Sequence, residues 1–257
     1  MKILFYTDSR GEHAVNFKGP IFPKKFKNKY SNKHDIDLLL CPFKWTTLID
    51  FIYLCKKNII DIQSYDLVIL YAGIVDFSPR PISGFNKAYN GSDESVINMK
   101  RLQYASNNKI NNNKKKIFES LVDSEILQKH LNSIDTTIYE NEYTRSLINN
   151  EIMEKTIIPF LQMIDKKMIY INCNKIHPTW EGNYLEINPN GRPKNINNIT
   201  NYNDILNYKI SNIIDLSIWD NDLIIKNTID NMHLTFEGSE YIYNKLIEII
   251  EKRNFVL

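Results

Sequence analysis

The chain has little cysteine, and its cysteines form no pair with the spacing of a redox motif or a metal site. Cys41, Cys55 and Cys173 are the three cysteines among 257 residues, and Cys41 and Cys173 end apolar runs. A cysteine in that setting ordinarily acts as a small buried hydrophobe. The sequence therefore predicts no disulfide framework, and it favours a reducing compartment, the cytoplasm.

Long apolar runs and an excess of one charge are also missing. No stretch approaches the roughly 20 apolar residues of a transmembrane helix, and polar residues follow the first short apolar run, so we expect no signal peptide and no membrane span. The net charge of +2 gives no electrostatic case for nucleic acid as a partner. We interpret two lysine clusters, at 24–29 and 114–116, as solvated loops or helix ends.

Several signatures of metal and nucleotide chemistry are absent. There is no H-E-x-x-H, no G-x-x-x-x-G-K-[ST] and no G-x-G-x-x-G. The remaining histidines do not have ligand-like spacing with other donors: His13, His34, His130 and His177. The G-x-S-x-G pentapeptide of the usual α/β-hydrolases does not occur either. We expect neither a metal nor a cofactor.

Short apolar runs alternate with segments of helical spacing. The runs expected to form strands are 2–7, 35–41, 66–72, 168–173 and, more weakly, 212–218. The expected helices are 45–57, a long one over 139–166 that Pro159 kinks or divides, and 236–252 with Thr235 as its cap. This alternation predicts an α/β fold whose mainly parallel, five-stranded sheet is covered on both faces.

We expect one domain over residues 1–257, because no repeat and no linker interrupts the chain. Residues 79–138 form a large, partly helical insertion, in which the polar stretch 107–116 is expected to be a loop. A second long connection is expected at about 174–210, with little periodicity over 188–207. Insertions beside a functional rim often shape the substrate cleft.

Polar residues follow the ends of several predicted strands. Ser9 follows the first, Gly73 to Asp76 the third, and Asn174 to His177 the fourth. Because the carboxyl ends of parallel strands lie at one edge of a sheet, these residues should share a rim. Asp230 and His233, three residues apart near the C-terminus, complete the parts for nucleophilic acyl chemistry. A serine hydroxyl needs an imidazole to take its proton and a carboxylate to orient that imidazole.

The chain resembles the SGNH (GDSL-type) hydrolases, which carry four sequence blocks on a three-layer, flavodoxin-like α/β fold. Thr7-Asp8-Ser9 is similar to the Gly-Asp-Ser block, and the segment from Asp230-Asn231-Met232-His233 to Gly238 is similar to the last block. Gly73-Ile74-Val75-Asp76 matches the Gly-x-Asn-Asp block in part, and the lone glycine of the second block is not placed. The resemblance implies Ser9 as nucleophile, His233 as general base and then acid, and Asp230 as orienting carboxylate.

The same resemblance implies that the backbone amides of Ser9 and Gly73 stabilise the oxyanion. Val75 stands where the family has an asparagine donor, and it has no donor of its own. Arg80, held between two prolines, is our candidate replacement, since a guanidinium offers five donors. An arginine paired with a surface carboxylate is the alternative. Asp76, which ends the block, is placed with these residues in the oxyanion and substrate-binding set.

An aromatic patch runs from His177 to Tyr184. Trp180 could form a sugar platform there, with its ring on an apolar sugar face, or it could anchor a long loop to the core. Ser9 could be an ordinary helix cap, His233 a structural histidine and Asp230 the cap of a turn.

The leading hypothesis is a serine esterase or acyltransferase that acts on an O-acyl group such as acetyl, carried by a small molecule or a glycan. The alternatives are a non-catalytic SGNH-fold binding or scaffold protein with a degenerate oxyanion hole, and a transferase within a glycan-assembly complex. Oligomeric state stays open.

Overall fold

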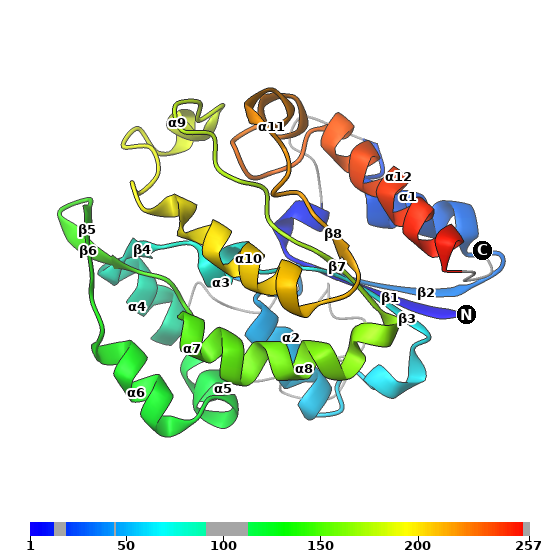
Figure 1. The fold of residues 1–257 in the computed structure, drawn as a ribbon, viewed down its shortest axis with the longest axis horizontal. Helices are drawn as coiled ribbons and strands as arrows, with labels where there is room; N and C mark the ends of the chain where they lie inside the picture. Colours follow the sequence, from blue (N-terminus) through cyan, green and yellow to red (C-terminus); the bar gives the residue numbers. More distant parts are fainter. Residues whose placement is uncertain (13–18, 44, 91–112, 254–257) are drawn as a thin grey trace.

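A parallel sheet of five strands, in the order β2-β1-β3-β7-β8, forms the centre of the computed structural model (Figure 1). Its strands are β1 (Lys2–Thr7), β2 (Asp35–Leu40), β3 (Leu67–Tyr71), β7 (Met168–Ile171) and β8 (Ile213–Ile214). The structure describes residues 1–12, 19–43, 45–90 and 113–253. The predicted α/β fold with a parallel five-stranded sheet is confirmed, and its strand order is the flavodoxin-like one.

Side chains on β1, which lies between β2 and β3, alternate between two apolar layers. Leu4 and Tyr6 belong to one buried cluster, and Ile3 and Phe5 belong to the other. Helices α1 (Phe22–Tyr30), α11 (Asn221–Asn227) and α12 (Phe236–Lys252) cover one face of the sheet. Helices α2 (Leu48–Lys56), α5 (Lys114–Leu121), α8 (Ile158–Ile164) and α10 (Ile199–Lys209) cover the other face (Figure 1). The result is a three-layer sandwich.

The last helix has the bounds that its sequence pattern predicts. Thr235 Oγ1 accepts a hydrogen bond from the Gly238 amide at 3.2 Å, as a helix cap does. A side chain at Gly238 would lie 2.2 Å from the Asn227 carbonyl oxygen, so glycine lets the first turn of α12 approach the end of α11. Leu246 and Ile250 are buried against the sheet.

The prediction of a long helix over 139–166 is wrong for the first part of this range. Strands β5 (Asp135–Tyr139) and β6 (Glu142–Arg145) form an antiparallel hairpin there, and β4 (Arg80–Pro81) adds a third strand beside β6. Glu140 and Asn141 have φ values of 52° and 63°, as the two central residues of a tight hairpin turn require. Beyond the hairpin the chain is helical: α7 (Asn150–Ile152), a π-helical turn (Met153–Ile157) and then α8, with Pro159 in its first turn.

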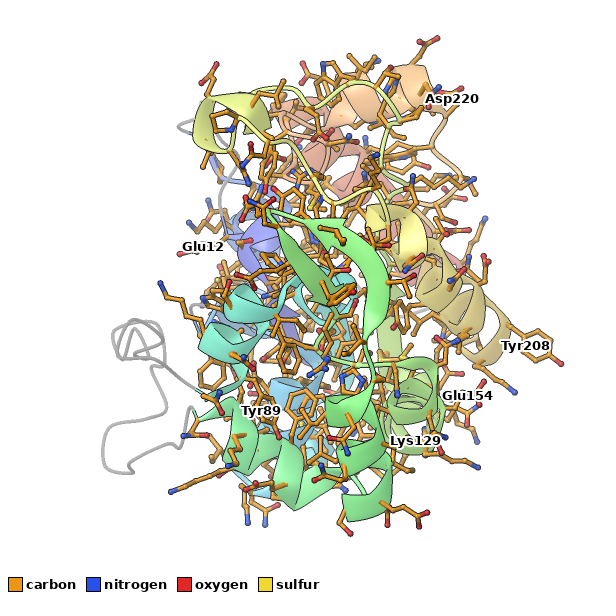
Figure 2. The ribbon with its side chains drawn as sticks, turned by 90° about the vertical axis from the view of Figure 1, so that its left-hand side faces the viewer. Glu12, Tyr89, Lys129, Glu154, Tyr208 and Asp220 are labelled. Atoms are coloured by element: carbon orange, nitrogen blue, oxygen red, sulfur yellow. The ribbon has the colours of Figure 1, made fainter. Side chains whose placement is uncertain are left out.

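The connection expected at 174–210 contains more helix than its composition predicts. It holds α9 (Tyr184–Ile187), a short 3-10 turn (Ile196–Asn198) and α10. Ile199, Tyr202 and Leu206 of α10 are buried at helical spacing, and the asparagines between them conceal that pattern. Figure 2 shows Tyr208, on the opposite face of this helix, projecting into solvent.

The insertion expected at 79–138 is largely helical in its described parts. It contains α4 (Ile82–Asn90), α5 and α6 (Ser124–Asn132). Of the loop predicted at 107–116, residues 107–112 lie outside the described residues, and Lys114 to Lys116 begin α5. No helix in the described ranges is both long and apolar enough to cross a membrane.

Our interpretation of the lysine cluster 114–116 as solvated is wrong for Lys114. Its side chain is buried and forms an ion pair with Asp50, which also caps α2 by accepting from the Thr47 amide at 2.9 Å. Asp76 is buried beside this pair and accepts from the Leu48 amide at 3.0 Å. Burial raises the pKa of Asp76 to about 7, and the nearby charge of Asp50 adds to this effect. The three side chains tie the insertion to α2 and to the segment after β3.

Replacing Lys114 by Met is expected to lower the free energy of unfolding by about 3 kcal/mol, because it leaves the carboxylate of Asp50 buried without its cation. Urea unfolding followed by circular dichroism measures the effect. Lys115→Met is the matched control, since Lys115 is exposed on the same helix turn. Equal effects of the two substitutions would contradict a stabilising role for the buried pair.

The raised pKa of Asp76 predicts a pH dependence of stability. A carboxyl group with a higher pKa in the folded chain stabilises the fold most below its unfolded pKa, and this contribution is lost as the pH rises to the folded pKa. The free energy of unfolding should therefore fall between about pH 4 and pH 7, by about 1.4 kcal/mol for each unit by which the pKa is raised. Asp76→Asn should remove this component of the slope, and an unchanged slope would contradict it.

Candidate active site

The turn that carries Ser9 begins directly at the end of β1. The Asp8 amide donates to the Tyr71 carbonyl of β3 at 2.8 Å, and Asp8 Oδ1 accepts from the Arg10 amide at 3.0 Å. Ser9 is thus the first residue of a 3-10 turn (Ser9–Gly11) that leaves the centre of the sheet. The side chain of Asp8 thus stabilises the turn that carries Ser9.

Ser9, His233 and Asp230 lie together, although Ser9 and Asp230 are 221 positions apart in the sequence. Ser9 Oγ is 3.1 Å from His233 Nε2, and His233 Nδ1 is 2.7 Å from Asp230 Oδ2. Asp230 Oδ1 accepts from the amide of His233 at 2.6 Å and from that of Met232 at 3.0 Å. The carboxylate therefore fixes both the ring and the backbone of the histidine.

The electrostatics of Asp230 favour its ionised form. Burial alone would raise the pKa of this carboxyl group, but the hydrogen bonds from His233 and the positive charge of Arg192 outweigh burial and hold the pKa below its usual value. The imidazole of His233 is about one-third exposed, at 33% of its side-chain surface. A reactant can reach the ring edge while the carboxylate behind it stays enclosed.

The loop that carries the acid and the histidine is tied to the segment after β7. Asn231, between them, has a left-handed φ of 72°. Its side chain accepts from the His177 amide at 2.7 Å and donates to the carbonyls of His177 and Trp180. Asn174 Nδ2 donates to the Asn231 carbonyl at 3.0 Å. Our sequence reasoning put Asn174 on the shared rim and Asn231 in the last block, but it gave neither side chain a role. An asparagine inside the Asp-x-x-His segment was the available signal, since this residue tolerates left-handed backbone.

Arg192 is a second residue that sequence reasoning missed. Its Nη2 donates to the Asp230 carbonyl at 2.5 Å and lies 3.6 Å from Asp230 Oδ2. Its Nε is 3.3 Å from Glu181 Oε2, and its guanidinium stacks over the ring of Tyr184 at 3.8 Å. Arg192 lies in an asparagine-rich stretch without periodicity, where no pattern distinguished it from a surface arginine.

Gly73 caps α3 (Ile74–Phe77) at the end of β3 with a φ of +133°. A side chain there would be strained, and its Cβ would lie 2.8 Å from Phe77 Cε2. The amides of Ser9 and Gly73 both begin helical turns, where backbone N–H groups have no partner within the helix. Such amides are the kind of donor that an oxyanion needs.

Arg80 lies beside this segment. Its Nη2 donates to the Val75 carbonyl at 2.7 Å, and its guanidinium is 4.8 Å from the ring centre of Trp45. Burial lowers the pKa of Arg80 to about 10, which still leaves it charged at neutral pH. Its contacts are thus the carbonyl of Val75, two residues after Gly73, and an aromatic face.

Two residues of the predicted site have mainly structural contacts. The prediction that Asp76 contacts substrate is wrong for this structure, because its carboxylate is fully buried against the first turn of α2. Trp180 is partly buried and packs on the apolar layer that α1 and α12 cover. Its amide donates to His177 Nδ1 at 2.8 Å, and the two rings meet edge to face. These contacts are those expected from the loop-anchor alternative.

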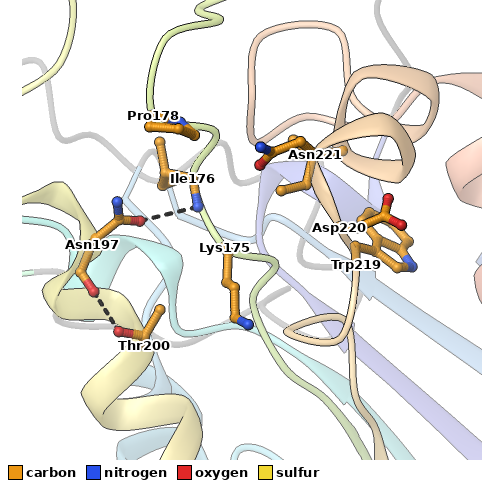
Figure 3. Close-up of a pocket in the computed structure, with 9 residues that line it drawn as sticks. Lys175, Ile176, Pro178, Asn197, Thr200, Trp219, Asp220 and Asn221 are labelled. Carbon is orange, nitrogen blue, oxygen red and sulfur yellow. Dashed lines mark hydrogen bonds between the residues drawn. The ribbon is translucent and has the colours of Figure 1, made fainter.

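Beyond the segment 174–180, a pocket of about 430 Å³ lies outside the ends of β7 and β8 (Figure 3). Its lining includes Lys175, Trp219 and Asn221, and Asn197 Oδ1 closes one side by accepting from the Ile176 amide at 3.2 Å. Within the parts of the chain that are described, no three His, Cys, Asp or Glu side chains are grouped as a metal site.

Known proteins were compared with the chain by sequence and by structure. No family model and no curated protein matches the sequence. The lipase/acylhydrolase from Enterococcus faecalis matches the structure over 98% of this chain and 96% of its own, with 13% identity and a TM-score of 0.50. The acetyl xylan esterase AlAXEase has 14% identity over 97% of this chain and 100% of its own, with a TM-score of 0.45. An acetylxylan esterase mutant from Geobacillus stearothermophilus has 10% identity over 96% and 92%, with a TM-score of 0.44.

At such low identity, the match to the acylhydrolase concerns the fold and not the substrate. The strand order, the three layers and the nearly complete overlap of the two chains agree with the fold that the sequence blocks around Ser9 and His233 imply. The chain therefore has the α/β fold of the SGNH-type hydrolases.

Proposed function

We propose that the protein is a serine-dependent O-acyl ester hydrolase or acyltransferase of SGNH type. The observation that carries this proposal is the continuous hydrogen-bonded chain from Ser9 Oγ through His233 to Asp230, with distances of 3.1 Å and 2.7 Å. These are the contacts that an activated serine requires. The fold shared with a lipase/acylhydrolase supports the same reaction class.

In the proposed mechanism, His233 Nε2 takes the proton of Ser9 as Oγ attacks the acyl carbonyl carbon. The tetrahedral intermediate collapses when His233 returns this proton to the leaving oxygen, so that the alcohol departs and an acyl-serine remains. Water, or a second hydroxyl in the transferase version, then attacks the acyl carbon while His233 takes its proton. The bond between the acyl carbon and Ser9 Oγ breaks as His233 returns this proton to Oγ, which releases the product and restores the serine. The anionic Asp230 stabilises the imidazolium that forms in both steps.

Negative charge develops on the carbonyl oxygen in both steps, and the amides of Ser9 and Gly73 are the proposed donors. Arg80 takes the place of the side-chain donor that Val75 cannot supply. Its Nη2 donates to the Val75 carbonyl, in the segment that follows Gly73. A fixed cation can stabilise an oxyanion as an amide does, over a longer range.

The acyl group is proposed to be small, with acetyl as the first candidate, and its carrier a small molecule or a glycan. We propose a location in the cytoplasm, because Cys55 and Cys173 are buried thiols that form no disulfide. The second candidate function is a binding or scaffold protein that keeps the fold without efficient chemistry. Val75 in the position of a family donor favours that candidate.

An activated serine should react with a fluorophosphonate. Intact mass and peptide mapping are expected to show one adduct, on Ser9, and none in Ser9→Ala. His233→Ala should slow labelling and lower kcat for nitrophenyl acetate by about 1000-fold or more, because the base is lost.

A folded protein without an adduct would favour the binding candidate. Circular dichroism of each variant shows whether the fold is retained, so loss of labelling can be assigned to the chemistry. Labelling that does not depend on His233 would contradict the proposed mechanism.

Replacing Arg80 by Met should lower kcat by about 100-fold with a smaller change in KM, because an oxyanion donor acts mainly in the transition state. Arg145→Met is the matched control. Arg145 pairs with Arg80 across β4 and β6, its Nη2 also donates to a carbonyl, and its guanidinium also stacks on an aromatic ring. Equal kcat values for the two variants would show that Arg80 has no part in the reaction.

A further inference from the structure

Arg192 contacts the candidate triad through Asp230. Its side chain is only 7% exposed, and its Nη2 donates to the Asp230 carbonyl at 2.5 Å and lies 3.6 Å from Asp230 Oδ2. The same carboxylate oxygen lies 2.7 Å from His233 Nδ1. Asp230 Oδ2 is therefore close both to the imidazole that would take the proton and to a buried cation.

Glu181 and Tyr184 hold the guanidinium of Arg192 on its other sides. Glu181 Oε2 lies 3.3 Å from Arg192 Nε, and Glu181 Oε1 accepts from the Arg192 backbone amide at 3.3 Å. The guanidinium carbon is 3.8 Å from the ring centre of Tyr184. Glu181 thus orients both the backbone and the side chain of the arginine, and the aromatic face limits its rotation. We call these three residues, Glu181, Tyr184 and Arg192, the arginine clamp.

The backbone at Arg192 is restricted on both sides. Gly191, before it, has a left-handed φ of 66°, which favours glycine, and the Gly191 carbonyl accepts from Tyr139 Oη at 2.5 Å. Pro193, after it, disfavours a helical conformation for Arg192. The side chain of Arg192 therefore extends from a backbone with few alternative conformations.

Arg192 holds Asp230 from outside the loop that carries it. Asp230 Oδ1 and Oδ2 contact residues of the same loop: Oδ1 accepts from the amides of Met232 and His233, and Oδ2 lies beside the His233 ring. Asn231 ties this loop to the segment after β7. The Asp230 carbonyl is instead held by Arg192, 38 positions away in the sequence. The orientation of Asp230 relative to the rest of the fold thus depends on the arginine clamp.

We propose that Arg192 is a positioning residue for the triad, which keeps the Asp230 carboxylate directed at His233 and limits protonation of that pair through its charge. The inference rests on the proposed function, since this position matters to the reaction only if His233 takes the proton of Ser9. A cation beside a carboxylate–imidazole pair disfavours a proton on the pair, and an anion beside the cation reduces this effect. In the arginine clamp, Glu181 is that anion.

Three neighbouring segments contribute charged or titratable groups around the pair of Asp230 and His233. They are Glu181, Tyr184 and Arg192 on the segment 181–192, His177 after β7, and Asp8 and Arg10 on the turn that carries Ser9. Asp8 and Arg10 compensate each other in a buried ion pair, and His177 Nδ1 accepts from two backbone amides. Glu181 and Arg192 are therefore the two charges whose separate removal tests the proposal.

Replacing Arg192 by Met should lower kcat for nitrophenyl acetate by about 10- to 100-fold with a smaller change in KM, because Asp230 acts when the imidazolium forms. Arg192→Lys should recover part of this loss, since it keeps the charge without the fork that reaches the Asp230 carbonyl and Glu181 together. Arg145→Met should leave kcat as in the wild type, although Arg145 also donates to a carbonyl and stacks on an aromatic ring. Equal kcat values for the wild type and Arg192→Met would overturn the inference.

The pH dependence separates the charge of Arg192 from a purely structural role. The acid limb of kcat/KM, on which the pair takes up a proton, should move to higher pH by about 0.5 to 1 unit in Arg192→Met. It should move to lower pH in Glu181→Gln, which leaves the arginine without its counter-ion. Structural damage alone would not give shifts of opposite sign, so shifts of one sign, or no shift, would overturn the inference.

A titration that needs no turnover distinguishes failure of this inference from failure of the proposed function. In Ser9→Ala, the NMR signals of the His233 ring are assigned by their loss when His233→Ala is added. Their titration midpoint should be displaced upward by Arg192→Met and downward by Glu181→Gln. A fixed midpoint would overturn the inference even if the fluorophosphonate labels Ser9. Displaced midpoints without labelling would support the action of Arg192 on the pair and remove the proposed reaction.

Discussion

A buried ion pair on either side of Ser9 is the interaction on which the rest of the candidate site depends. Asp8 and Arg10 are fully buried, and Arg10 Nη2 is 2.8 Å from Asp8 Oδ2. Burial opposes the charged guanidinium, but the carboxylate of Asp8 outweighs it and raises the pKa of Arg10 above its usual value. Arg10 also stacks over the ring of Tyr71 at 4.1 Å. Loss of either partner would leave the other charge buried without a counter-ion. The ion pair therefore favours one conformation of the turn, and this fixes the position of Ser9 at the end of β1.

His233 lies within hydrogen-bonding distance of Ser9 Oγ because the loop that carries Asp230 and His233 is also held in place by hydrogen bonds. Asn231 binds the segment after β7 through three hydrogen bonds, and Arg192 holds the Asp230 carbonyl. The place of β1, between β2 and β3, brings Ser9 beside Gly73 at the same edge of the sheet. The site is therefore built from the ends of neighbouring strands and one C-terminal loop, and its geometry follows from the parallel register of the sheet.

Periodicity and chain order were enough for the five strands of the parallel sheet, for α12 and for the grouping of Ser9, His233 and Asp230, but not for β4, β5 and β6. They failed where local composition concealed the periodic signal, as in α10, or where a short turn interrupted an apparently helical stretch, as at Glu140 and Asn141. Asp76 was misassigned because a motif position does not reveal burial. Arg192 was missed for a different reason: its contacts with Asp230 join residues 38 apart, and such a pairing has no local pattern.

In the proposed reaction, the replacement of the family's asparagine by Val75 changes the kind of oxyanion stabilisation and not only its amount. An asparagine amide must point at the oxyanion to help it, whereas a guanidinium acts through its charge over several ångströms. Arg80 stays charged at neutral pH, because burial lowers its pKa only to about 10, and a carbonyl and an aromatic ring hold it in place. A second arginine, Arg192, lies on the Asp230 side of the site, where its Nη2 donates to the Asp230 carbonyl.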